Sequence, residues 1–154
     1  MMLSLPNQAG TYVLRLKLPG PARLVIGRLG EFDFPSGNYL YLGSAFGPGG
    51  LAGRLTHHLS EVKRPHWHID HFRQVANVFE VCYAAGLPSL ECQWSQRVAN
   101  LPGVEVPAPG FGASDCPCGC AAHLYFIPRQ VDSTLIGAIL HECGDNWVYL
   151  PKIE

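Results

Sequence analysis

Residues 39–58 read YLYLGSAFGPGGLAGRLTHH, and this short stretch carries signals for a strand, a tight turn and a helix. Residues 39–44 are aromatic and aliphatic up to a closing Gly-Ser pair, which favours a strand. The run Gly47-Pro48-Gly49-Gly50 is a strong turn signal. Residues 51–62 then repeat apolar side chains every three or four positions, which predicts a helix with one apolar face. The stretch therefore predicts a strand, a glycine turn and an amphipathic helix in direct succession.

The residues before this stretch predict further strands. Residues 11–18 (TYVLRLKL) alternate strand formers with polar residues, as a half-buried strand does. Residues 22–34 predict one long strand or two short ones, interrupted near residues 27–30. Because the intervening turns are too short for crossover helices, we expect an antiparallel meander.

The residues after this stretch alternate between helical and extended patterns. Helices are expected at residues 66–76, 90–100 and 132–141, with Ser89 and Asp132 as the caps of the last two. Trp67, Phe72 and Val75 are the expected core members of the first of these helices. Strands are expected at residues 78–85, 123–127 and 147–150. With no internal repeat or linker, the pattern predicts one domain over residues 1–154.

Composition and charge narrow the class of protein. The chain has 154 residues, of which 47% are hydrophobic and 15% charged, so it can bury a core. Its net charge of −1 argues against a charge-driven coat for nucleic acid, although residues 54–73 form a locally basic, histidine-rich stretch. The first ten residues lack the pattern of a secretory signal, and no apolar run is long enough for a bilayer. We expect a cytoplasmic location and no membrane partner.

Arg54 and His58 are the first candidates for chemistry. A spacing of four puts them on one helical face, and the neighbouring leucines predict that both point outward. An arginine fork beside a helix N-terminus suits a phosphate group. The alternative is a solvated arginine with a surface histidine.

Tyr12, Tyr41 and Glu91 are weaker candidates when taken singly. Each tyrosine lies in a predicted strand, where a half-buried aromatic side chain is common, but a phenol can also carry a proton or orient a water molecule. Glu91 lies in the first turn of its helix, where it could favour the helix dipole or bind Mg²⁺ or Mn²⁺.

Three cysteines crowd into the segment CPCGC at residues 116–120. Cysteines this close are poorly placed to pair with each other, so we expect reduced thiols. With the nearby histidine they resemble a Zn²⁺ site in residue type, and the predicted ligands are Cys116, Cys118, Cys120 and His123. A further ligand could be Cys92, Cys143 or His141. The alternative is a set of free thiols in a tight loop.

His66, His68 and Asp70 form a supporting cluster. His66 and Asp70 are four residues apart and could make a capping or ion-pair contact on one helix. His68 could pack internally or reach a phosphate.

Taken in order, Gly10-Thr11-Tyr12, Tyr41-Leu42-Gly43, Arg54, His58 and Glu91 resemble the GIY-YIG nuclease superfamily, and the wider pattern of residues 10–127 looks like its DUF123 branch. The resemblance implies a small α/β (α+β) fold with a central antiparallel sheet flanked by helices. It also implies cleavage of a nucleic-acid phosphodiester, DNA rather than RNA, with one divalent metal.

The resemblance also assigns roles to the candidate residues. Glu91 would bind Mg²⁺ or Mn²⁺, and Tyr12 would act as general base or orient the water, supported by Tyr41. Arg54 would stabilise charge on the phosphate, while His58 would assist proton transfer or hold the tyrosines. A protein partner or a homodimer would supply affinity for the target.

The sequence departs from the superfamily pattern in its longer gap between the two tyrosine motifs, where residues 22–34 look like an insert. Two other functions therefore stay open at this point. One is a non-catalytic module that binds nucleic acid or protein and holds a structural zinc. The other is a zinc-bound redox or carrier protein built around residues 116–123.

Overall fold

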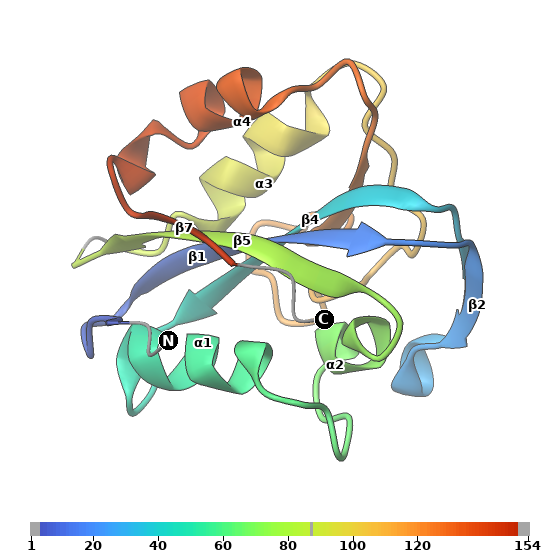
Figure 1. Ribbon diagram of the computed structural model, residues 1–154, viewed down its shortest axis with the longest axis horizontal. Coiled ribbons are helices and arrows are strands. Elements are labelled where there is room, and N and C mark those ends of the chain that lie inside the picture. Colours follow the sequence, from blue (N-terminus) through green and yellow to red (C-terminus); the bar gives the residue numbers. More distant parts are fainter. Residues whose placement is uncertain (1–3, 87, 151–154) are drawn as a thin grey trace.

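The computed structural model describes residues 4–86 and 88–150, and within them the chain forms a five-stranded antiparallel sheet with helices on both faces (Figure 1). The strand order is β6-β4-β1-β5-β7. These strands are β1 (Gly10–Leu18), β4 (Gly37–Ala45), β5 (Asn77–Ala85), β6 (Leu124–Ile127) and β7 (Trp147–Tyr149). The predicted α/β class, with its central antiparallel sheet, is confirmed.

The expected meander is wrong for the first four strands. β1 pairs directly with β4 from Gly10↔Ala45 to Leu18↔Gly37. The insert forms a separate hairpin of β2 (Ala22–Val25) and β3 (Glu31–Phe34), joined by the short helix η1 (Gly27–Leu29), and it projects from the end of the sheet (Figure 1). Because the hairpin leaves the main sheet, the insert does not separate the two strands that carry the tyrosine motifs.

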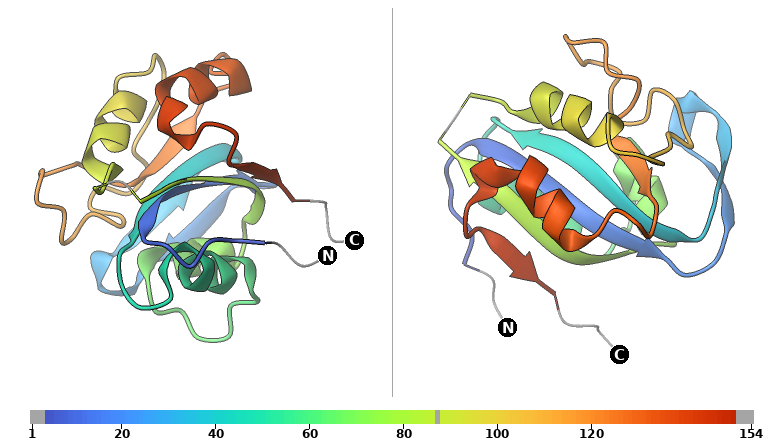
Figure 2. Two further views of the ribbon diagram at one scale, coloured as in Figure 1. Left: turned by 90° about the vertical axis from the view of Figure 1, so that its left-hand side faces the viewer. Right: turned by 90° about the horizontal axis from the view of Figure 1, so that it is seen from above.

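Two pairs of helices enclose the sheet (Figure 2). On one face lie α1 (Gly50–Leu59) and α2 (His68–Arg73), and on the other lie α3 (Glu91–Ala99) and α4 (Ser133–Ile139). The short helix η2 (His141–Cys143) follows α4. Alternation along the strands sends Leu14 and Leu16 to the α1–α2 core, and Val13 and Leu42 to the core around Trp94. Each such fully buried side chain contributes about 1.5–3 kcal/mol.

Helix ends are where the sequence-based predictions fail most often. α1 and α2 are shorter than expected, and Val75 is 39% exposed because it follows the end of α2 instead of facing the core. Asp132 caps α4 as predicted, accepting a hydrogen bond from the Leu135 N–H at 2.9 Å. Leu90 and not Ser89 is the N-cap of α3.

No helix within residues 4–86 and 88–150 combines the length and the apolar character needed to cross a bilayer.

Gly43 is required by the packing of the two central strands. A methyl group on Gly43 would overlap the hydroxyl of Tyr12, its cross-strand partner. We therefore expect Gly43→Ala to displace the Tyr12 ring and lower the free energy of unfolding by about 1–3 kcal/mol. Urea denaturation measures this change.

The matched control is Gly137→Ala in α4, where an added methyl group meets no neighbour within 4 Å. That substitution should be neutral or stabilising, by up to about 1 kcal/mol, because alanine favours a helix. Equal stability of the two variants would show that Gly43 has no packing role.

Candidate functional site

A single groove of about 790 Å³ gathers most of the predicted site residues. Its walls include Tyr12, Tyr41, Arg54, His66, His68, Glu91, Cys116, Cys118 and His123. Arg54 comes from α1, while Glu91 begins α3 on the opposite face of the sheet. The groove therefore runs around the edge of β4, where the pairing with β6 stops at Tyr41.

Tyr12 and Tyr41 lie side by side because of the strand register. Tyr12 pairs with Gly43, and Tyr41 lies two residues before Gly43, so both side chains occupy the same face of the sheet. The direct β1–β4 pairing therefore brings the two tyrosine motifs together in spite of the insert between them. Both rings are largely buried, at 0% and 8% exposure.

His58 is buried beneath Tyr12, at 1% exposure, and the prediction that it points outward is wrong. The reason is helical spacing: His58 lies seven residues after Leu51 and three after Leu55, which places it on the buried stripe. The Tyr12 hydroxyl lies 2.6 Å from His58 Nε2. Burial, aided by the nearby Arg73 and His57, lowers the pKa of His58 to about 3, so the imidazole is neutral and can accept a hydrogen bond from the phenol.

The neutral state of His58 should make stability depend on pH. Its pKa is about 3 in the folded chain and about 6.5 when unfolded, so the unfolded chain binds the extra proton as pH falls below 6.5. We expect this residue alone to lower the free energy of unfolding by about 3 kcal/mol between pH 7 and pH 4. Urea denaturation at both pH values measures the loss.

The comparison uses His58→Phe, which keeps a ring and removes the titration, and His66→Gln at an exposed histidine. His58→Phe should shrink the pH dependence and His66→Gln should keep it. An unchanged dependence in His58→Phe would contradict a neutral, buried His58.

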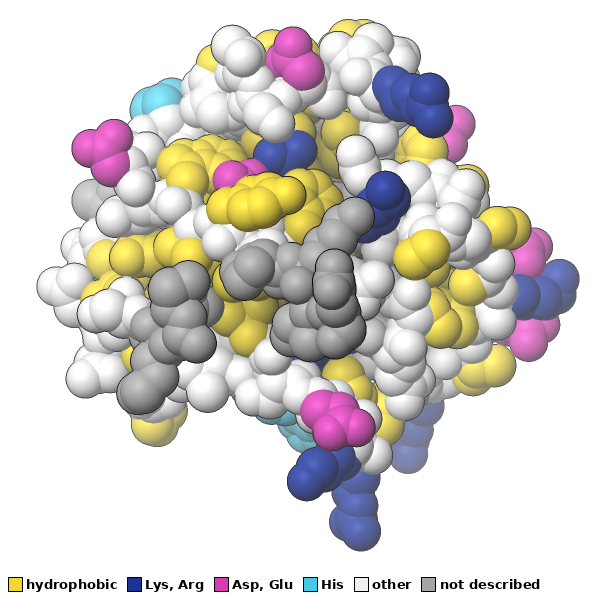
Figure 3. Space-filling view, viewed as in Figure 1, with side chains coloured by type: hydrophobic (Ala, Val, Ile, Leu, Met, Phe, Trp, Pro, Cys, Tyr) yellow, Lys and Arg dark blue, Asp and Glu magenta, His cyan; other side chains and the backbone are white. Residues whose placement is uncertain are grey.

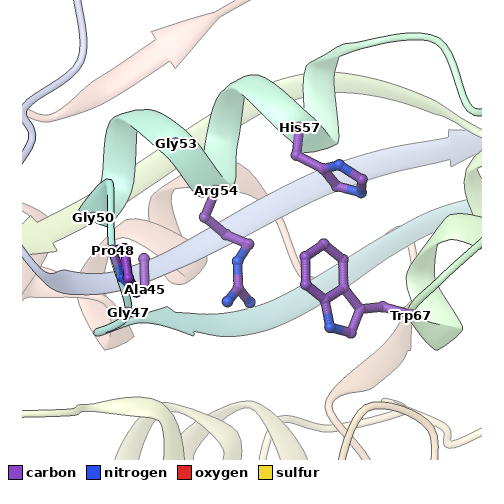
Figure 4. A pocket seen from close by; sticks show the side chains of 8 residues that line it. All are labelled: Ala45, Gly47, Pro48, Gly50, Gly53, Arg54, His57 and Trp67. Carbon is purple, nitrogen blue, oxygen red and sulfur yellow. The ribbon is translucent and has the colours of Figure 1, made fainter.

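Arg54 faces the groove from α1 with its guanidinium held against an indole (Figure 4). Its Cζ atom lies 4.4 Å from the centre of the Trp67 ring, which is a cation–π contact. Burial raises the pKa of Tyr12, and the charge of Arg54 opposes this effect, so the guanidinium also lies close to the phenol. A smaller pocket, lined by Gly47, Pro48 and Trp67 among others, continues past Arg54 along the glycine turn (Figure 4).

Glu91 is held by side chains on both of its carboxylate oxygens. The Ser44 hydroxyl donates to Oε2, and His123 Nδ1 lies 2.6 Å from Oε1. Burial lowers the pKa of His123, but Glu91 and then Cys116 outweigh it, so the pKa is raised overall. Each carboxylate oxygen keeps a further lone pair, so the residue can still accept a metal ion. His123 is thus a partner of Glu91, which the sequence analysis missed.

Thr11 and Ser44 fix the start of α3 next to the sheet. The Leu90 N–H donates to Thr11 Oγ1 at 2.9 Å, and Thr11 pairs with Ser44 across β1 and β4. The sequence analysis placed Thr11 in a strand and gave it no further role. The signal it offered was its hydroxyl: a buried hydroxyl needs a partner, and this one is 1% exposed.

Asp70 caps α2 instead of joining the site. Its Oδ2 accepts hydrogen bonds from the backbone N–H groups of His66 and Trp67, at 2.9 and 3.0 Å. The expected capping contact is therefore confirmed, although it uses the backbone of His66. His68 lines the groove, and its Nδ1 accepts from the Gly112 N–H at 2.9 Å.

The cysteines do not form the predicted set. Cys118 forms a disulfide with Cys92 at the start of α3, so the expectation that all the thiols are reduced is wrong for this pair. Sequence reasoning excluded pairing within residues 116–120 and could not locate the distant partner. Cys92, Cys116 and Cys120 lie together, with sulfur atoms within 4.8 Å of one another, and this cluster could hold a metal ion.

The other suggested ligands lie elsewhere. Cys143 is buried beside Cys82 in the second core, and His141 is exposed on η2. Of the two free thiols in this cluster, Cys116 is the more acidic, because the pKa of Cys120 is raised by burial. Burial also raises the pKa of Cys116, but hydrogen bonds from the backbone of Cys120 and Cys118, followed by those of the Cys120 and His123 side chains, bring it to about 7.

The fold and the groove define a small α/β protein with a polar site of tyrosine, arginine, histidine and carboxylate at one sheet edge. Residues 11–143 match the family described as "Domain of unknown function DUF123", and the chain belongs to this family. No curated protein and no solved structure matches it.

Proposed function

We propose that the chain is a divalent-metal-dependent endonuclease of the GIY-YIG type that hydrolyses phosphodiester bonds in DNA. One observation carries this proposal: Tyr12, Tyr41, Arg54 and Glu91 line a single groove, although they come from β1, β4 and opposite faces of the sheet. A phosphodiester needs positive charge at its phosphoryl oxygens, a positioned water molecule and a protonated leaving oxygen. The groove holds side chains suited to the first two needs, Arg54 for the phosphoryl oxygens and Tyr12 for the water molecule.

The two tyrosine motifs support membership of the superfamily through their glycines. Gly43 leaves room for Tyr12, and a methyl group on Gly10 would overlap the backbone oxygen of Ala84 on β5. The glycine of the second motif is therefore linked to the tyrosine of the first by packing across β1 and β4, and the glycine of the first motif allows β5 to lie close to β1.

Arg54 is the residue that receives the phosphate. Its guanidinium is oriented by Trp67, and it lines both the main groove and the smaller pocket along the glycine turn. A fork held in this way can donate two hydrogen bonds to phosphoryl oxygens and stabilise the charge that develops on them.

Tyr12 orients the attacking water in its neutral form. Burial raises its pKa above the ordinary value, so a phenolate base is disfavoured. The phenol instead keeps its proton, donates a hydrogen bond to neutral His58, and retains oxygen lone pairs that can accept a hydrogen bond from water. His58 is a positioning residue, because it does not line the groove itself and acts on it through its hydrogen bond to Tyr12.

Glu91 would hold Mg²⁺ or Mn²⁺ with one of its oxygens. A carboxylate is the ligand such ions prefer, and the remaining coordination positions suit water and phosphate. The ion would supply Lewis-acid stabilisation of the phosphoryl group. Ser44 and His123 fix the carboxylate orientation by contacts to each oxygen.

Exposed basic side chains near the groove supply a place for the DNA backbone. Lys63 and Arg64 are exposed on the segment between α1 and α2. This segment lies at the bottom of the view in Figure 1, and basic side chains project from the bottom of the molecule in Figure 3, which has the same view. Arg73 does not contribute, because it is bonded internally to His57 O and Ser60 O. With so few exposed cations, a protein partner or a second copy of the chain adds affinity.

The test is cleavage of end-labelled DNA. Duplex, flapped and four-way branched substrates are incubated with the protein and Mg²⁺, Mn²⁺ or EDTA. We expect cleavage of at least the branched substrates with metal and none with EDTA. Cleavage that persists in EDTA would contradict the proposal.

One observation favours a second function, a non-catalytic nucleic-acid-binding module. Both carboxylate oxygens of Glu91 already have partners in the structure, which weakens a single-carboxylate metal site. This function predicts DNA binding by gel shift without cleavage across all metals and substrates, and such a result would replace the nuclease proposal.

A further inference from the structure

Four cysteine sulfurs meet where the long segment between α3 and β6 folds back onto the start of α3. Cys92 Sγ lies 3.8 Å from Cys116 Sγ and is bonded to the sulfur of Cys118. Cys120 completes the group, because its sulfur lies within 4.8 Å of those of Cys92 and Cys116. Four sulfurs at such separations match the set of ligands that surrounds a tetrahedral metal ion.

The segment that carries three of these sulfurs is long and has little regular secondary structure. It extends from the end of α3 at Ala99 to the start of β6 at Leu124 and, in the described structure, contains only the isolated Glu105–Phe126 bridge as regular pairing. Long segments without secondary structure are uncommon in compact domains unless something fixes them. Buried Phe111 and the hydrogen bond from Gly110 N–H to Ala121 O hold its base, and a cross-link to α3 would hold residues 116–120.

The local backbone is arranged for a thiolate ligand. Gly119 has a φ of +67°, which turns the chain tightly between Cys118 and Cys120. The sulfurs on either side of this turn, those of Cys116 and Cys120, lie within 4.8 Å of each other, as two ligands of one ion must.

We propose that the reduced chain binds one Zn²⁺ through Cys92, Cys116, Cys118 and Cys120, and that the Cys92–Cys118 disulfide is the metal-free oxidised form of the same site. Soft thiolates select zinc over Mg²⁺, so this site is distinct from the one at Glu91. Four thiolates complete a tetrahedral site, so we assign the ligands to the cysteines and give His123 another role: its Nδ1 lies 2.6 Å from Glu91, which places it between the cysteine cluster and the carboxylate.

Interconversion of the two forms balances with a small-molecule disulfide as oxidant. The thiolates of Cys92 and Cys118 each lose one electron and join as a disulfide, while the oxidant gains two electrons and, with two protons, becomes two thiols. Zinc leaves as the aqueous ion, because only two thiolates remain. In a reducing compartment the zinc form is favoured.

The zinc site would also hold Glu91 in place, because Cys92 is the next residue of α3. Any effect of zinc on cleavage through Glu91 rests on the proposed nuclease function, whereas zinc binding itself does not. Failure of the nuclease proposal leaves the zinc measurement intact.

The experiment measures bound metal by elemental analysis on the full chain, purified with a phosphine reductant and zinc. We expect one zinc per chain, and less than about a tenth of that after oxidation by glutathione disulfide and desalting. Cobalt in place of zinc should show the absorption of a tetrahedral four-thiolate complex. Reduced, folded protein without stoichiometric zinc would overturn the proposal.

Single variants identify the ligands. Cys92→Ser and Cys116→Ser should lose zinc or bind it at least 100-fold more weakly, while Cys143→Ala, outside the cluster, should retain it. His123→Gln should also retain zinc with an unchanged cobalt spectrum. Zinc kept by Cys92→Ser but lost from His123→Gln would overturn the four-cysteine assignment. Circular dichroism tests whether each variant is folded. If a variant does not fold, the ligand type is judged from the cobalt spectrum of the wild type.

Discussion

Glu91→Gln is expected to lower the single-turnover rate of DNA cleavage by about 1000-fold or more, with the substrate affinity nearly unchanged. A neutral amide has the shape of the carboxylate but binds a hard divalent cation poorly, so the variant loses several kcal/mol of transition-state stabilisation. Each 1.36 kcal/mol corresponds to a tenfold change in rate. The measurement is cleavage of end-labelled branched DNA with enzyme in excess, across a series of Mn²⁺ concentrations.

The control for this variant is Glu31→Gln. Glu31 lies on the β2–β3 hairpin and pairs with Arg23 at an exposed position, so its loss should leave cleavage intact. Substrate affinity comes from a gel shift in Ca²⁺ or EDTA. If Glu91→Gln cleaves at the wild-type rate with an unaltered metal requirement, Glu91 does not hold the catalytic metal.

Arg54→Ala is expected to lower the cleavage rate by about 100- to 1000-fold. The guanidinium is the cation that faces the groove from α1, and removal of one preoriented donor to a developing charge has an effect of this size. Arg54→Lys should recover only part of the loss, because an ammonium group lacks the planar fork and stacks poorly on Trp67.

Arg129→Ala is the matched control, since Arg129 is an exposed arginine outside the groove. The Arg54 variants should unfold at nearly the wild-type urea concentration, which separates loss of chemistry from loss of fold. An Arg54→Ala protein that cleaves at the wild-type rate would remove the phosphate-binding role from this residue.

The two tyrosine strands and the glycine turn could be predicted from local pattern alone. Residues 11–18 and 39–44 have strand periodicity, and the structure places β1 and β4 there. The direct pairing of β1 with β4 could not be predicted, because the short turns indicated only that strands adjacent in the sequence can pair. The structure instead excludes residues 22–34 from the sheet as a separate hairpin.

Burial decided the errors at the site. Spacing alone puts Arg54 and His58 on one face of the helix. A helix packed on a sheet, however, buries a wider stripe than the positions of Leu51 and Leu55 alone indicate. His58 therefore lies under the sheet, where it contacts Tyr12. The partners of Glu91 were missed for a different reason, because His123 and Ser44 are distant in sequence and meet Glu91 only when α3 docks on the edge of β4.

The cysteines show the same limit of local reasoning. The CPCGC segment indicated a metal site and left Cys92, Cys143 and His141 as further candidates, and only the tertiary structure shows that Cys92 is the one beside the segment.

The location of a bound manganese ion tests the central claim most directly. Crystals of the wild type and of Glu91→Gln, grown with Mn²⁺, are compared by anomalous scattering at the manganese edge. The proposed function predicts a peak bonded to a Glu91 oxygen, facing Arg54 and Tyr12 across the groove, and its absence in Glu91→Gln. A peak that remains in Glu91→Gln, or a wild-type groove without manganese in a protein that still cleaves DNA, would contradict the account.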